Sequence, residues 1–325
     1  MRCAMDSIDL RVLQGNRAAQ TTPRRAVIYA GSFPQFPPVK RTEAPLTYAC
    51  MPRQNPMAFA CRFLLLVCAV SALGQDGTRV DLGTHKLNIV CTGAPEAHPV
   101  VVLEAGGGGT SAAWSGVQAA LPSKIRACAY DRAGSGKSDP GPQPRTMDAE
   151  VADLHALLER SGITEPIVFV GQSLGGILAR LYFHKYPASV AGMLLIDPTD
   201  EDSVVFNTRV NRWLKVRELQ DSLGDAARSV AKDRQENPVP LGNRPLIVIG
   251  AGKRPQPPGT SVEQWLEMRN ERDAHVKGLS KLSGSSKFIL DPASGHNVEH
   301  DNPKLVAKAI QDLVNEISLS RRPGE

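Results

Sequence analysis

Hydrophobic and polar positions alternate in blocks between about residue 80 and residue 318. Short apolar runs predict buried strands, because a strand that is covered on both faces has no polar side. The predicted strands are residues 87–90, 100–103, 125–130, 167–170, 193–196, 246–249 and 288–290. Each run is bounded by glycine, proline or polar residues, which are typical of the turns between elements.

Longer segments between these runs have apolar positions three and four residues apart, which predicts helices with one buried face. They are residues 111–121, 147–158, 174–186 and 305–314, and a polar stretch at 199–243 is also largely helical in this interpretation. Strands that alternate with helices are typical of an α/β protein, in which a parallel sheet is covered on both faces.

Residues 1–56 show neither period and contain seven prolines, so we interpret them as unstructured or as upstream of the true start of translation. Residues 57–74 differ, because Arg62 is followed by an apolar run at 63–73 and by small residues up to Gly74. This order is typical of a secretory signal peptide, and the run is shorter than the roughly 20 residues of a membrane span. We therefore expect an exported protein, periplasmic or extracellular, that touches a membrane only through this segment if it stays uncleaved.

Composition and charge exclude several classes of protein. Of the 325 residues 42% are hydrophobic, which is enough for a packed core and excludes wholesale disorder. The net charge is +5, but residues 1–74 carry nine Lys or Arg and only three Asp or Glu. The remaining chain has 29 basic and 30 acidic side chains, a net charge of −1. We therefore expect no nucleic-acid partner.

Residues 171–175 read Gly-Gln-Ser-Leu-Gly, which fits the G-x-S-x-G pattern of a nucleophile elbow. A predicted strand ends just before this segment, and a predicted helix begins just after the serine. A sharp turn between them would hold Ser173 in a strained backbone conformation and expose its hydroxyl group at the end of the strand. Glycines two positions before and after the serine would let neighbouring backbone pass close by. The pattern therefore indicates an activated serine.

Three further segments complete a resemblance to the α/β-hydrolase superfamily. Residues 104–109 (EAGGGG) are similar to the glycine-rich oxyanion loop that follows the third strand in that superfamily. Residues 130–138 (YDRAGSGKS) are similar to its D-x-x-G-x-G-x-S segment, and residues 294–296 (SGH) to the Gly-His after its last strand. One departure is Gln172, where many members have histidine.

The resemblance covers residues 80–318 and implies one α/β-hydrolase domain at 75–325. The implied architecture is a mostly parallel eight-stranded sheet with helices on both faces. A small helical lid is expected at about residues 199–243.

The same resemblance implies three catalytic roles, in the order serine, acid, histidine along the chain. Ser173 would be the nucleophile, and His296, after the last predicted strand, would be the general base. His300, four residues further on, is the rival base. The acid is harder to assign, because the loop after strand 246–249, its commonest position, contains no acid before Glu263.

The other acid position known in the superfamily follows the preceding strand, where Asp197 comes directly after residues 193–196. Neighbouring parallel strands end at the same edge of a sheet, which would bring Asp197 close to Ser173. Asp197-Pro198 also fits the start of a helix, with an N-cap residue and a proline at the first position. The alternatives for the acid are Asp200, Glu201, Asp202 and Asp291.

An oxyanion hole needs two N–H donors. The resemblance implies that one donor is the backbone of Leu174, directly after the serine. For the other we choose Gly107 of the glycine-rich loop, with Gly106 and Gly108 as alternatives. Glycine at these positions would let the backbone approach a substrate closely.

Two cysteines, Cys91 and Cys128, lie beyond residue 74. In the sheet order of the superfamily, the strands that carry them are neighbours. Together with the expected export, this favours the hypothesis of a Cys91–Cys128 disulfide, since exported proteins can keep disulfides.

Two patterns resemble cofactor sites. Residues 133–138 end like a phosphate-binding P-loop, but Asp131 stands where that motif requires its first glycine. Residues 296–300 spell H-x-x-E-H, a zinc-protease pattern that needs both histidines on one helix. A glycine precedes this segment and Pro303 follows it within one turn, which is unfavourable for such a helix. We therefore expect neither a metal nor an organic cofactor.

These features favour a serine hydrolase that acts on a small-molecule ester or amide, with carboxylic esters expected first. Peptidase and C–C-bond hydrolase activities use the same machinery and stay open. The alternative from another class is a non-catalytic ligand-binding module, since this superfamily also contains receptors and adhesion domains. The sequence does not indicate the oligomeric state. Apolar lid residues could line an acyl pocket or pack on the core: Val204, Val205, Phe206, Trp213 and Leu214.

Overall fold

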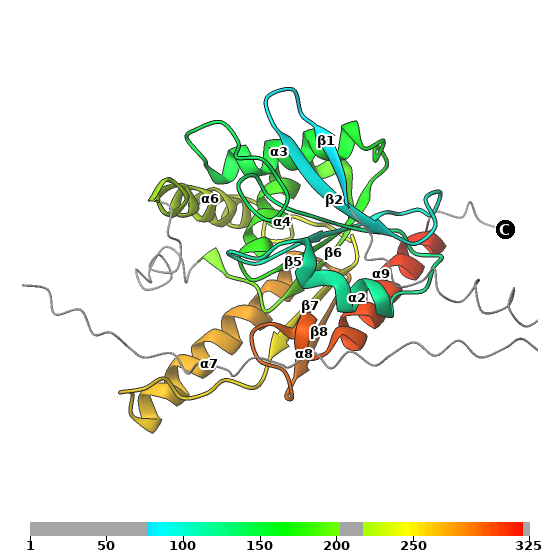
Figure 1. Ribbon diagram of the computed structural model, residues 1–325. Helices are drawn as coiled ribbons and strands as arrows, with labels where there is room; N and C mark the ends of the chain where they lie inside the picture. The colour runs from blue at the N-terminus through cyan, green and yellow to red at the C-terminus, as the bar shows by residue number, and fades with distance from the viewer. Residues whose placement is uncertain (1–76, 202–216, 321–325) are drawn as a thin grey trace, which may run out of the picture. The chain divides into compact units, whose positions relative to one another are not determined.

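An eight-stranded sheet runs through the part of the chain that the computed structural model describes, residues 77–201 and 217–320 (Figure 1). Its strand order is β1-β2-β4-β3-β5-β6-β7-β8. The strands are β1 Thr78–Asp81, β2 Lys86–Thr92, β3 Val101–Glu104, β4 Ala127–Tyr130, β5 Ile167–Gln172, β6 Val190–Ile196, β7 Leu246–Ala251 and β8 Ser286–Asp291. Strands β1 and β2 pair antiparallel with their neighbours, whereas β4, β3 and β5 to β8 are parallel. The mostly parallel eight-stranded sheet expected from the sequence is confirmed.

Helices cover both faces of this sheet, and each face has its own apolar core. On one face the core includes buried residues of α3, α4 and α6, such as Leu154, Ile177 and Ala227. On the other face it includes Trp114 of the 3-10 helix η1 and Ile310 of α9. The helices are η1 Ser111–Trp114, α2 Ser115–Ala120, α3 Met147–Arg160, α4 Leu174–Lys185, α6 Arg217–Glu236, α7 Val262–Gly278, α8 Val298–Asp301 and α9 Pro303–Ser320. None of the helices in the described ranges is both long enough and apolar enough to cross a bilayer.

The sequence analysis missed an edge strand and a long helix. Strand β1 carries a single apolar residue, Val80, and is mostly exposed at the edge of the sheet, so it has no apolar run. Helix α7 is 17 residues long, yet Val276 is its one buried residue, so it has no apolar stripe. Its signal in the sequence is the capping box in which Ser261 and Gln264 satisfy each other's backbone N–H groups.

Part of the predicted lid and the whole of the predicted signal peptide lie outside the described residues. Within 199–243, helix α6 packs against α3 and α4, with Leu223, Ala226 and Val230 buried. The lid positions for which two roles were considered lie outside the described residues: Val204, Val205, Phe206, Trp213 and Leu214. Residues 57–74 lie outside them as well.

The register of the parallel strands determines where the functional candidates meet. Gln172, at the end of β5, is paired with Ile196, at the end of β6, and Ile196 is in turn paired with Ile249 of β7. Ser173 and Asp197 are the residues that follow, so they leave the sheet at the same level. The Ser173 N–H donates to the Ile196 carbonyl at 3.0 Å. The loops that follow strands β5 to β8 therefore lie at the same edge of the sheet.

A disulfide joins the antiparallel part of the sheet to its parallel part. Cys91 of β2 and Cys128 of β4 lie directly opposite each other in the ladder, and their sulfur atoms are bonded. Cys128 is buried, and Cys91 packs against the same core. The bond closes a loop with a sequence separation of 37 residues.

Replacing both cysteines by alanine tests the contribution of this bond. We expect the C91A/C128A variant to lose about 2–4 kcal/mol of free energy of unfolding, because the unfolded chain is no longer constrained by the cross-link. Urea denaturation followed by circular dichroism measures the loss. Wild type that has been treated with a reducing agent should unfold at the midpoint of the variant. Equal stability of oxidised wild type and variant would contradict a structural disulfide.

Candidate active site

Ser173 stands at a tight turn between β5 and α4, with φ 52° and ψ −117°. A left-handed φ is unfavourable for serine, so surrounding contacts must hold this conformation. Those contacts depend on two glycines. A Cβ atom on Gly171 would lie 2.4 Å from the Gly175 carbonyl oxygen, and one on Gly175 would lie 2.5 Å from the Glu104 carbonyl oxygen. Only glycine therefore lets strand, helix and β3 come together beneath the serine.

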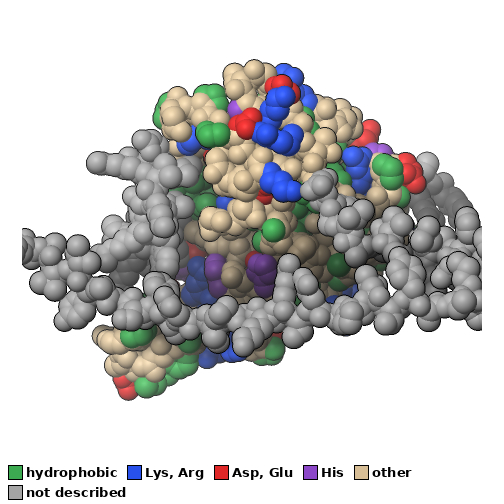
Figure 2. All heavy atoms as spheres, viewed as in Figure 1, with side chains coloured by type: hydrophobic (Ala, Val, Ile, Leu, Met, Phe, Trp, Pro, Cys, Tyr) green, Lys and Arg blue, Asp and Glu red, His purple; other side chains and the backbone are tan. Residues whose placement is uncertain are grey.

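His296 reaches the serine hydroxyl from the loop after β8. Its Nε2 lies 2.9 Å from the Ser173 Oγ, and 48% of its side chain is exposed. The side chain of Gln172 donates to the His296 backbone carbonyl at 3.0 Å, so the residue before the serine also fixes the histidine loop. In the space-filling view, histidine and basic side chains lie next to one another in the middle of the face, above α7 (Figure 2).

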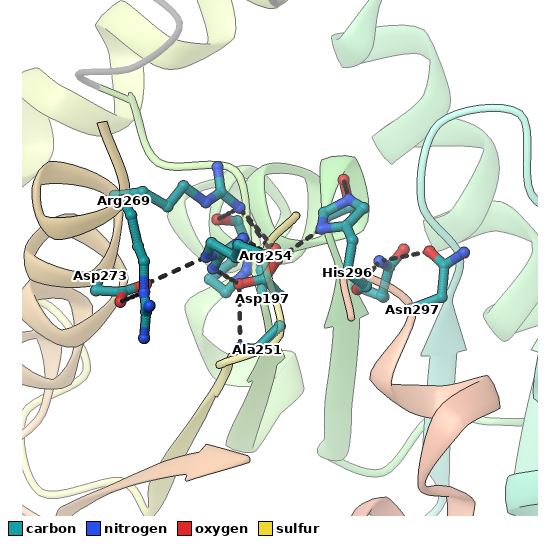
Figure 3. Close-up of polar contacts among 11 residues, drawn as sticks. Asp197, Ala251, Arg254, Arg269, Asp273, His296 and Asn297 are labelled. Atoms are coloured by element: carbon teal, nitrogen blue, oxygen red, sulfur yellow. Dashed lines mark hydrogen bonds and ion pairs between the residues drawn. The ribbon is translucent and has the colours of Figure 1, made fainter. Parts of the chain in front are cut away.

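Asp197 lies on the other side of the imidazole ring, at the end of β6 (Figure 3). Its Oδ2 is 2.6 Å from the His296 Nδ1, and the aspartate is fully buried. A carboxylate at this distance accepts a hydrogen bond from Nδ1–H, which assigns the proton to Nδ1 and leaves Nε2 to accept from the Ser173 hydroxyl. Ser173, His296 and Asp197 therefore form a continuous hydrogen-bonded chain.

The Asp197 carboxylate has three further donors around it. Arg254 donates to Oδ1 at 2.6 Å and to Oδ2 at 3.3 Å, Arg272 reaches Oδ2 at 3.5 Å, and the Ala251 N–H reaches Oδ1 at 3.3 Å. Burial alone raises the pKa of Asp197. The hydrogen bond from His296 and the positive charges of Arg272 and Arg254 outweigh burial and hold that pKa well below its usual range.

The acids that follow in sequence have other partners. Asp200 is buried and lies 3.3 Å from the Nδ1 of His275. Glu201 is fully buried and forms an ion pair with Arg180 of α4. Asp202 lies outside the described residues. Neither described acid is the hydrogen-bond partner of the histidine that faces Ser173.

The two remaining alternatives also point elsewhere. Asp291, at the end of β8, accepts hydrogen bonds from the Ser294 hydroxyl group at 2.6 Å and from the Asn302 amide at 3.0 Å. It thereby shapes the loop that carries the histidine. The Nε2 of His300 lies 3.8 Å from Glu299, and His300 is largely exposed.

The glycine-rich loop after β3 lies directly against the elbow. A Cβ atom on Gly106 would lie 2.2 Å from the Gln172 side-chain oxygen and 3.2 Å from the Ser173 Cβ. Gly107 and Gly108 are exposed, so solvent or a substrate can reach their backbone. The other predicted oxyanion donor is the N–H of Leu174. It belongs to the first residue of α4, where the helix provides no acceptor for it.

Arg132, the second residue after β4, fixes the orientation of two peptide groups in the glycine-rich loop. It donates to the Ala105 carbonyl at 2.7 Å and to the Gly106 carbonyl at 2.6 Å. In a trans peptide the C=O and N–H groups point in opposite directions. The N–H groups of Gly106 and Gly107 are therefore directed away from the guanidinium group.

The guanidinium group of Arg132 is itself buried and paired. It forms an ion pair with Glu104, which also accepts a hydrogen bond from the Tyr130 hydroxyl group. Burial raises the pKa of Glu104, against the opposing charge of Arg132. These three buried side chains form a polar support beneath the glycine-rich loop.

Asp131, in the segment that resembles D-x-x-G-x-G-x-S, has a structural role. Its carboxylate accepts from the N–H groups of Ser111 at 2.7 Å and Lys137 at 2.9 Å and from the Asn88 amide at 3.0 Å. The hydroxyl group of Ser138 donates to the Asp131 carbonyl at 2.6 Å. The segment therefore ties β2, β4 and η1 together.

Comparisons with known proteins agree with this architecture. Residues 99–239 match a family model described as alpha/beta hydrolase fold. An AB hydrolase superfamily protein from Gibberella zeae is 35% identical over 279 residues, an alignment that covers 66% of this chain and 86% of that protein. The protein YqjL of Bacillus subtilis is 32% identical over 216 residues, covering 66% of this chain and 82% of that protein.

The chain belongs to the α/β-hydrolase superfamily. Solved structures support the same fold at lower identity. An esterase from Thermogutta terrifontis is 19% identical with a TM-score of 0.52, covering 74% of this chain and 98% of that one. The haloalkane dehalogenase DbeA from Bradyrhizobium elkani is 16% identical with a TM-score of 0.55, covering 75% and 98%.

Three arginines of this hydrolase were missed by the sequence analysis. Arg254 follows β7, in the loop where many superfamily members carry the acid, and Arg272 comes from α7. A basic residue at the usual acid position was the available signal for Arg254. Arg132 gave no comparable signal, because its role depends on carbonyl groups that a sequence does not show.

Glu299 of this hydrolase, on the short helix α8, is a buried carboxyl group three residues after His296. It is 4% exposed, and its Oε2 has no hydrogen-bond partner among the described residues. Burial is the main cause that raises the pKa of Glu299 to about 7, assisted by the negative charges of Asp301 and Asp197. Between about pH 4.5 and pH 7 the folded protein therefore holds a proton on this group that the unfolded chain has released.

This raised pKa predicts how stability depends on pH. A raised pKa stabilises the folded state below the unfolded value, and the benefit is lost as the pH rises toward 7. The E299Q variant cannot ionise, so we expect it to nearly match wild type near pH 4.5 and to exceed it by about 3 kcal/mol near pH 8. Urea denaturation at both pH values measures the difference. The exposed E267Q variant is the control, and an equal response of both variants would contradict the raised pKa.

Proposed function

We propose that the protein is a serine hydrolase that cleaves carboxylic esters through an acyl-enzyme intermediate. The observation that carries this proposal is the chain from Ser173 Oγ through His296 to Asp197, with contacts of 2.9 Å and 2.6 Å. Such a chain is the arrangement that converts a weakly nucleophilic hydroxyl into an attacking group.

In this mechanism the Ser173 oxygen attacks the acyl carbon while the His296 Nε2 takes the hydroxyl proton. The carbonyl oxygen of the ester becomes an oxyanion, which the N–H groups of Leu174 and Gly107 stabilise. The tetrahedral intermediate then collapses, and the departing alcohol receives the proton from His296. A water molecule repeats the sequence on the acyl-enzyme and releases the acid.

Asp197 holds the imidazole in the required tautomer and stabilises the imidazolium that forms in both steps. Its full burial and its 2.6 Å contact with His296 support this role. The same contact favours an enzyme over a non-catalytic binding module, because it supplies His296 with an acid although the commonest acid position, after β7, has none before Glu263. Esters are proposed as the substrate class because an alcohol is a better leaving group than an amine.

We also propose that the protein acts in an oxidising compartment after export through residues 57–74. The Cys91–Cys128 disulfide supports this, since disulfides persist in secreted and periplasmic proteins and are rare in the reducing cytosol. No metal or organic cofactor takes part in the proposed mechanism.

Labelling with a fluorophosphonate probe tests the proposed function, because such probes react with activated serines. We expect wild type to be labelled and S173A not to be. The D197N variant should be labelled at least about 100-fold more slowly, because its histidine loses the orienting carboxylate. The exposed D148N variant is the control and should react like wild type. No labelling of folded wild type would contradict the proposal, and a loss confined to D200N would move the acid role to Asp200.

The support of the oxyanion loop by Arg132 gives a second test. We expect R132M to lower kcat for a p-nitrophenyl ester by about 10- to 100-fold with little change in KM, because the loop N–H groups lose their alignment. The R126M variant is the matched control, since Arg126 also donates to a backbone carbonyl but is far more exposed. A fall in kcat that only matches the lost folded fraction would contradict a positioning role.

A further inference from the structure

Alternating charges extend outward from the histidine that faces Ser173 (Figure 3). His296 contacts Asp197 at 2.6 Å, and Asp197 contacts Arg254 at 2.6 Å. Arg254 in turn contacts Asp273 of α7 through its Nε at 3.2 Å, and Arg269 lies 3.7 Å from Asp273. The chain therefore leads from the loop after β8, through the ends of β6 and β7, to partly exposed side chains of α7.

Arg254 places a full positive charge against the buried carboxylate of Asp197. Its guanidinium group contacts both oxygens, the geometry in which arginine pairs most strongly with a carboxylate. The neutral N–H of Ala251 already approaches Oδ1. A full positive charge at this position does something that a neutral donor cannot, because it offsets the negative charge that would otherwise stabilise a protonated His296.

We propose that Arg254 is a positioning residue that sets the acid limit of activity by keeping His296 neutral at lower pH, and that Asp273 moderates this effect. The inference rests on the proposed function, in which neutral His296 is the general base. A weaker negative charge beside the ring makes the imidazolium less stable, so the ring loses its proton at lower pH. Asp273 takes up part of the Arg254 charge and therefore acts in the opposite direction.

Other charged groups also face the pair formed by Asp197 and His296. Arg272 of α7 contacts Asp197, and Glu299 and Asp301 of α8 lie near the histidine loop. These groups remain in place in every variant below. A difference in the measured midpoint between variants therefore results from the substituted residue.

Titration of the His296 ring by NMR tests the inference without relying on hydrolysis. The ring signal is identified by its absence in the H296N variant. We expect R254Q to raise the pH midpoint of this signal by about one unit, because the full Asp197 charge then acts on the imidazolium. D273N should lower the midpoint by a smaller amount. Opposite shifts for two neighbouring residues are not expected from a loss of structure.

Two further variants complete the design. R254K retains the positive charge and should restore a midpoint close to that of wild type. R228Q, which removes an exposed arginine paired with Asp225, should leave the midpoint unchanged. The pH dependence of fluorophosphonate labelling should move with the NMR midpoint in each variant that is labelled.

The outcomes separate the two proposals. Equal midpoints in wild type, R254Q and D273N would overturn the role of Arg254. If R254Q fails to fold, D273N alone decides, because a midpoint that does not fall would contradict the inference. Midpoint shifts in the expected directions, in a protein whose wild type does not react with the probe, would contradict the proposed function instead.

Discussion

A buried carboxylate requires compensation for its charge, and the surroundings of Asp197 are organised by that requirement. The side chain has no contact with solvent, so water cannot stabilise its ionised form. A histidine, two arginines and a backbone N–H converge on it from three segments of the chain, namely β7 with its following loop, α7, and the loop after β8. Removing any one of them changes the environment of the others. The geometry at Ser173 is therefore coupled to the loop after β7 and to α7, although the Ser173 hydroxyl itself contacts His296.

The second constraint is steric and lies beneath the serine. Strand β5, helix α4 and strand β3 approach so closely there that Gly171 and Gly175 have no room for a Cβ atom. The register of β5 against β6 then places Ser173 and Asp197 at the same level of the sheet edge. Backbone packing brings the candidate groups together, and the electrostatic pairing of Asp197 holds them in orientation.

The sequence predicted much of this arrangement, and the omissions have physical reasons. Ser173, His296 and Asp197 could be found because each directly follows or lies close behind a strand that is visible as an apolar run. The sheet was predicted for the same reason, except for β1, which lies at the exposed edge and lacks such a run. Helix α7 was not predicted, because it is largely exposed and its sequence has no apolar period. Arg254 and Arg132 act through contacts between distant segments, which neither composition nor spacing records.

The disulfide has a topological consequence for the candidate site. The ring closed by Cys91 and Cys128 contains β3, the glycine-rich loop and both η1 and α2. Gly107 and Gly108 are among the exposed residues of that ring. A protease that cuts the backbone there leaves two pieces still tied by the bond between β2 and β4. A nicked molecule would therefore remain a single covalent species, with its two pieces joined through the adjacent strands β2 and β4.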